Sequence, residues 1–117
     1  MIKLEISVFP QHSKYLEFSQ SLNSIMPELK QRCTTIQITE QDKTFTILLH
    51  VESVQELSSI LHSKELGILS GAIRTLGKKS EVIIHGLSHE KRGATINEIK
   101  LSYSKKENNQ LNKKNND

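Results

Sequence analysis

The sequence predicts an α+β domain with an antiparallel sheet that carries its helices on one face. Three stretches support this prediction: a strand-like alternation in residues 2–8, two β-branched runs joined by a short turn in residues 34–51, and helical apolar stripes in residues 53–76. A chain of 117 residues can build one hydrophobic core and has no room for a second. We therefore expect one folded domain.

The N-terminal third predicts a strand followed by a helix. Residues 2–8 alternate apolar and polar side chains, which is the period of a half-buried strand. Pro10 ends this strand because proline cannot donate to the ladder. Ser13 can cap a helix whose apolar side chains recur at three- and four-residue steps as far as Leu29. Pro27 lies inside this helix and predicts a kink or a break.

The middle of the chain predicts a hairpin and then a helix. Residues 34–40 are β-branched, residues 41–43 have turn composition, and residues 44–51 alternate again, so the two runs should pair. Ser53 and Glu56 follow with the spacing of a capping box, which marks the start of a helix.

The helical stretch should pause near Ser63 and stop at Gly77, for which we expect a left-handed conformation. Residues 80–87 (SEVIIHGL) predict one more strand. The order strand, helix, strand, strand, helix, strand is the ferredoxin-like split βαβ arrangement, β-α-β-β-α-β. One face of such a sheet stays uncovered, and a second copy of the chain is the simplest cover. We therefore expect a homodimer.

Beyond residue 87 the pattern weakens. We divide the chain into a folded domain (1–87), an extension (88–103) and a Lys/Asn-rich tail (104–117) that we expect to be disordered. Within the extension, the alternation in residues 96–103 predicts an additional strand, which would pair with the partner chain.

Charge and composition exclude several classes of function. The net charge of +3 comes entirely from residues 88–117, because Lys/Arg and Asp/Glu balance over residues 1–87. A neutral body lacks the basic face of a nucleic-acid-binding protein. No apolar run approaches the ~20 residues of a membrane span. The chain opens directly into a strand pattern and has a single cysteine, Cys33, so we expect a cytoplasmic protein.

Four segments together resemble the antibiotic biosynthesis monooxygenase family. They are residues 50–57 (HVESVQEL), 61–66 (LHSKEL), 69–73 (LSGAI) and 81–85 (EVIIH). The resemblance implies a dimeric α+β barrel without a cofactor. It also implies a monooxygenase-like oxidoreductase that acts on an aromatic or quinol-type small molecule in a cavity between the helices and the sheet.

The chain departs from the family at the residues expected in that cavity. Val51 stands where the family usually has tryptophan, and Ile60 stands where it usually has histidine. With Ile6 and Val8, these residues would line the predicted pocket. The same apolar set is also typical of a packed core. The second hypothesis is therefore a non-catalytic dimeric module that binds an apolar ligand or a protein partner.

Four polar residues are candidates for catalysis. His50 and His85 share the opposite sheet face with Glu5, where they would shuttle a proton or bind a metal, or else form hydrogen bonds at an interface. The sequence contains no His/Cys/Asp motif with the spacing of a metal-binding site. His62 lies two residues after the position of the family's helix histidine and would take over its role, or else it interacts with the helix dipole. Arg74 would hold an anionic substrate group, or else face solvent.

Overall fold

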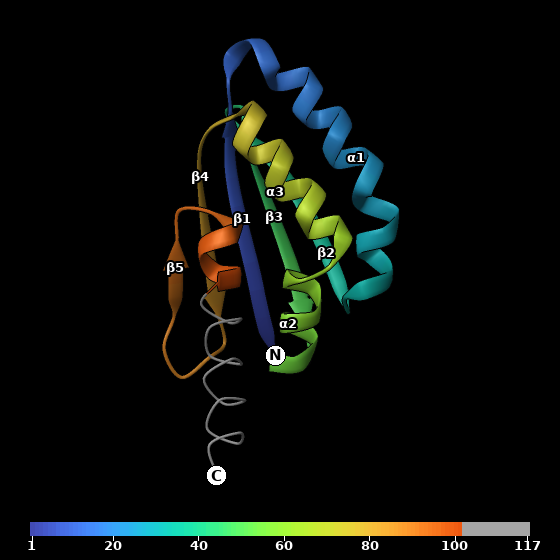
Figure 1. The fold of residues 1–117 in the computed structure, drawn as a ribbon, viewed down its shortest axis with the longest axis vertical. Coiled ribbons are helices and arrows are strands. Elements are labelled where there is room, and N and C mark those ends of the chain that lie inside the picture. Colours follow the sequence, from blue (N-terminus) through green and yellow to red (C-terminus); the bar gives the residue numbers. More distant parts are fainter. Residues whose placement is uncertain (102–117) are drawn as a thin grey trace, which may run out of the picture.

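The structure, a computed structural model, describes residues 1–101. It contains a five-stranded antiparallel sheet in the order β2-β3-β1-β4-β5, with helices on one face (Figure 1). The elements are β1 (Ile2–Pro10), the short 3-10 helix η1 (His12–Lys14), α1 (Tyr15–Arg32), β2 (Thr35–Gln41), β3 (Thr44–Val51), α2 (Val54–Leu61), α3 (Lys64–Leu76), β4 (Gly77–His85) and β5 (Lys91–Gly93). The predicted ferredoxin-like order is confirmed, with its second helix divided into α2 and α3.

Strand β1 is the centre of the sheet and pairs with β3 on one side and β4 on the other. In this register Leu4 lies between Leu49 and Ile84. Residues that oppose each other across strands point to the same face, so these side chains form one apolar layer beneath the helices. All three have no exposed surface.

The hairpin between β2 and β3 closes through a two-residue turn at Asp42 and Lys43. Both residues have positive φ angles, 53° and 64°. Positive φ at both central positions is the signature of a type I′ turn, whose twist matches that of the paired strands. The predicted hairpin is therefore confirmed, although neither turn residue is glycine.

Two serines set the starts of α2 and α3. The Ser53 hydroxyl accepts a hydrogen bond from the amide of Glu56 at 3.2 Å, and the Glu56 carboxylate accepts one from the amide of Glu52 at 2.9 Å. The Ser63 hydroxyl accepts from the amide of Leu66 at 3.2 Å. Because both serines satisfy otherwise open N–H groups, the chain forms two short helices separated by a pause.

Two local predictions in the helices need correction. Helix α1 continues through Pro27 without the break that was one of the two predicted outcomes. Gly77 is extended (φ −84°, ψ 145°) instead of left-handed. The absence of a side chain still matters at Gly77, because a Cβ there would lie 2.5 Å from the carbonyl oxygen of Ile73. Strand β4 can therefore begin directly where α3 ends.

The additional strand predicted over residues 96–103 is also wrong in its position. The fifth strand is β5, and residues 96–101 are helical. Ile96 and Ile99 lie three residues apart, which is helical spacing, and both are buried in the core. That burial favours helix over strand. Residue 102 onward, including the tail for which we predict disorder, lies outside the described residues.

Candidate functional site

The core between the helices and the sheet is solid at the positions predicted to line a pocket. Ile6, Val8 and Val51 are 0% exposed, and Ile60 is 1% exposed. A side chain with no accessible surface touches no space as large as a water molecule. The packed-core alternative fits this arrangement, and a pocket-lining role for these four residues stays a prediction.

A hollow of about 400 Å³ lies on the helix side, at the edge of this core. It is bounded by the end of α3, the start of β4 and residues 94–97, and we call it the Arg74 hollow. Ile73 and Ile96 form its apolar floor, and Arg74 brings positive charge to its wall. Lys78 also lines the hollow, but its ammonium lies 6.0 Å from the centre of the Phe9 ring. Its volume lies within the range of small-molecule sites.

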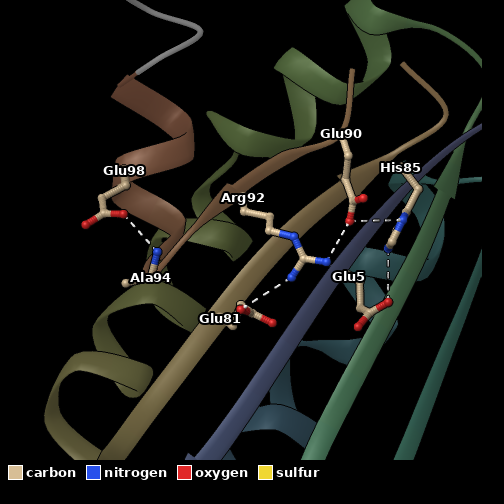
Figure 2. Close-up of polar contacts among 7 residues, drawn as sticks. All are labelled: Glu5, Glu81, His85, Glu90, Arg92, Ala94 and Glu98. Carbon is tan, nitrogen blue, oxygen red and sulfur yellow. Dashed lines mark hydrogen bonds and ion pairs between the residues drawn. The ribbon is translucent and has the colours of Figure 1, made fainter. Parts of the chain in front are cut away.

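Hydrogen bonds fix the outer wall of the Arg74 hollow. The Ser80 hydroxyl donates to the carbonyl of Ala94 at 2.6 Å, which ties the wall to β4. The Glu98 carboxylate accepts from the amide of Ala94 at 2.8 Å (Figure 2). The amide of Glu98 donates to the Thr95 hydroxyl at 3.1 Å. The reciprocal bonds form a capping box at the start of the helical residues 96–101.

The lining of the Arg74 hollow favours binding over acid–base chemistry. Its other polar side chains are hydroxyls, an amide and a lysine: Ser70, Ser80, Thr95, Asn97 and Lys79. Among the described residues that line the hollow there is no histidine or carboxylate to act as a general base near neutral pH, and the neighbouring Glu98 carboxylate accepts a hydrogen bond from the amide of Ala94. The geometry can hold an anion but offers no evident proton acceptor.

A chain of polar contacts and ion pairs crosses the open face of the sheet, and we call it the open-face network. His85 is central: its Nε2 lies 3.1 Å from Glu5 Oε1, and its Nδ1 lies 3.9 Å from Glu90 Oε1 (Figure 2). Arg92 continues the network, 3.0 Å from Glu90 and 3.6 Å from Glu81. The network joins β1, β4 and β5, and so attaches the extension to the domain.

Beside the open-face network, Met1, Lys3 and Leu48 complete a second hollow of about 510 Å³ with Glu5 and His85. His50 does not join this group. His50 and His85 each pair with Lys3 from opposite sides of β1, so two strand spacings, about 10 Å, separate them.

His50 has a different environment from His85. Its Nδ1 lies 3.3 Å from the sulfur of Met1, and its buried Nε2 has no hydrogen-bond partner within residues 1–101. No group of three or more His, Cys, Asp or Glu residues in that part of the chain has the arrangement of a metal site. The catalytic roles of His50 and His85 stay predictions, and the structure brings His85, but not His50, to a carboxylate.

The other two candidate catalytic residues, His62 and Arg74, lie at the ends of helices. His62 caps α2, is exposed, and its Nδ1 lies 2.9 Å from the carbonyl oxygen of Ser58. This placement fits the helix-dipole alternative. Arg74 lies in the last turn of α3, at the hollow described above. Sequence reasoning missed the contribution of Arg92 and Glu90, because only tertiary contacts bring the extension to His85.

Comparison with known proteins gives a clear result for the fold. The crystal structure of an antibiotic biosynthesis monooxygenase superposes with a TM-score of 0.67 over 76% of this chain and 100% of that chain, at 12% identity. This chain has the antibiotic biosynthesis monooxygenase fold. A relative of that class from Deinococcus radiodurans gives a TM-score of 0.67 at 15% identity, covering 76% of this chain and 94% of that chain.

A Nitrosomonas europaea protein of the same class gives a TM-score of 0.65 at 7% identity, covering 76% of this chain and 100% of that chain. At such identities the likeness establishes the monooxygenase fold alone. No family model matches the chain, and no curated protein is similar to it in sequence. None of the helices within residues 1–101 is both long and apolar enough to cross a membrane.

Proposed function

We propose that this chain is a homodimeric protein of the monooxygenase fold that binds a small molecule and does not oxidise it. The main support is the solid core at Val51 and Ile60, where the resembled family has tryptophan and histidine. Cofactor-free oxygenation requires a base and a hydrogen-bonding wall in a desolvated site. The buried layer around these two residues is aliphatic and supplies neither.

The homodimer is supported by the uncovered face of the sheet. Phe9 and Leu48 lie on that face beside the open-face network, and Phe9 is 36% exposed. A mixture of apolar side chains and ion pairs is typical of a protein–protein interface. A second copy of the chain, face to face, would cover them.

The single cysteine fits a reducing compartment such as the cytoplasm.

Oxygen consumption tests whether the protein is catalytic. The full-length chain is incubated with a panel of aromatic quinols, and dissolved oxygen is followed by an electrode. We expect no rate above autoxidation of the quinol in buffer. A protein-dependent rate that saturates with substrate would overturn the proposal, and heat-denatured protein serves as the control for adventitious metal.

The second candidate function is monooxygenase-type oxidation of an aromatic or quinol-type compound. The observation that favours it is the likeness in fold to proteins described as antibiotic biosynthesis monooxygenases. Under this hypothesis the helices would separate from the sheet to admit substrate, and the oxygen assay would give a positive rate.

Light scattering tests the homodimer. We expect twice the mass of one chain at micromolar concentration. Leu48→Arg, which adds charge to the open face, should shift the protein towards the monomer. Ile68→Arg, at a residue of α3 that is 46% exposed on the helix side, is the matched control and should leave the mass unchanged. A wild-type monomer would contradict the interface.

A further inference from the structure

We infer that the Arg74 hollow is a binding site for a small aromatic anion, with its carboxylate at Arg74 and its ring on the floor of the hollow. This inference rests on the proposed ligand-binding function and names the ligand class and the site. One wall of the hollow is formed by residues 94–97, which belong to this chain's extension.

The positive charge at the hollow is that of Arg74, which forms no ion pair within residues 1–101. Arg32 and Arg92, by contrast, both pair with carboxylates. The described lining of the hollow contains only neutral and basic side chains. A bound anion would supply the counter-charge for Arg74. Arginine also offers two parallel donors to one carboxylate.

Backbone amides at the start of the neighbouring helical turn do not supply the anion site. The amide of Ala94 already donates to the Glu98 carboxylate, and the amide of Glu98 already donates to the Thr95 hydroxyl. An incoming anion would meet the Glu98 carboxylate if it approached these amides. The charged contact must therefore come from the side chain of Arg74, on α3.

The floor of the hollow requires an apolar body on the ligand. Ile73 is 7% exposed and Ile96 is 2% exposed, and both belong to the hydrophobic core. A bare inorganic ion would leave this apolar surface in contact with water. An aromatic ring would cover it, and burial of apolar area from water is favourable. A volume near 400 Å³ accommodates a single substituted ring.

Chemical-shift mapping of the full-length protein tests this assignment, with benzoate as the probe. We expect benzoate to shift the amide signals of Gly77, Lys78 and Thr95. Arg74→Gln, an exposed site that leaves the fold intact, should weaken benzoate binding about tenfold, the effect of losing one charged hydrogen bond. Lys30→Gln, an exposed change on α1 away from the hollow, should leave binding unchanged.

Two further probes define the ligand class. Benzamide keeps the ring without the charge, and inorganic phosphate keeps charge without the ring, so both should bind more weakly than benzoate. Absence of benzoate shifts at the hollow, or equal affinity in Arg74→Gln, would overturn the assignment. Phosphate binding as tight as benzoate would overturn the aromatic part.

The benzoate experiment tests the site independently of the oxygen-consumption assay, which tests the proposed function. A positive oxygen-consumption rate would contradict the non-catalytic proposal, yet the benzoate shifts and their dependence on Arg74 would still stand. Loss of the shifts would contradict the site alone.

Discussion

The guanidinium of Arg32, at the end of α1, pairs with the carboxylate of Glu65 in the first turn of α3. The Glu65 side chain is 9% exposed and that of Arg32 is 45% exposed. The pair connects two helices that lie side by side over the sheet (Figure 1).

Arg32→Ala should lower the free energy of unfolding by about 1–3 kcal/mol, because it leaves the buried Glu65 carboxylate without its partner. The measurement is urea unfolding followed by circular dichroism. The control is Lys14→Ala, which breaks an exposed ion pair with Glu17 and should cost less than about 1 kcal/mol. Equal losses in the two variants would mean that the Arg32–Glu65 pair contributes little.

Ile60→Ala should lower the free energy of unfolding by about 2–5 kcal/mol, because it leaves a cavity in a packed core. Ile68→Ala removes the same atoms from a side chain that is 46% exposed, and its cost should stay below about 1 kcal/mol. Thermal and urea unfolding of both variants check this difference. A small loss at Ile60 would indicate that space already exists beside it, and would favour the monooxygenase hypothesis.

Tyr15 should ionise only above its ordinary range. Its hydrogen bond to Glu40, its burial and the nearby Glu40 charge all raise the pKa of the Tyr15 phenol above 10.0. Because the folded-state pKa exceeds the unfolded value, this contribution to stability is present below pH 10 and is lost as pH rises through the folded pKa.

Ultraviolet titration of phenolate absorbance checks the pKa of Tyr15. Tyr103→Phe serves as the background, since the chain has two tyrosines. Glu40→Gln should bring the Tyr15 pKa back towards 10, while Glu28→Gln, an exposed change elsewhere on α1, should not move it. A titration midpoint unaffected by Glu40→Gln would contradict the assigned cause.

Cys33 should react slowly with iodoacetamide at pH 7. Burial raises the pKa of its thiol above 9.0, and its Sγ donates to the carbonyl of Leu29 at 3.2 Å. Because the thiolate is the reactive form, the folded protein should be alkylated more slowly than the protein unfolded in urea. Mass spectrometry of timed samples measures both rates, and equal rates would show that the fold does not protect the thiol.

Local patterns predicted most of the fold. The alternation of residues 2–8, the turn at Asp42 and the cap at Ser53 each act over a few neighbouring residues, so each can be recognised without knowledge of the rest. Strand β5 is different. Its three residues are too short for a periodic signal, and it forms because β4 offers a free edge.

The candidate site was predictable only in part. Arg74 was a candidate from its type and its place near the end of a helix, but the hollow beside it needs residues 94–97 to fold back over β4. In the same way, Glu5 and His85 were placed on one face from their alternation, whereas the approach of Arg92 and Glu90 depends on the extension.

The sequence by itself determined the order of strands and helices, the division of each strand into a core face and an open face, and the helix starts at Ser53 and Ser63. These features depend on periodicity and on hydrogen bonds between near neighbours in the chain. Only the tertiary structure decided that the core is solid at Ile60 and that a charged hollow forms at Arg74. Both depend on how closely segments distant in sequence pack, because the same apolar side chains can fill a core or line a cavity.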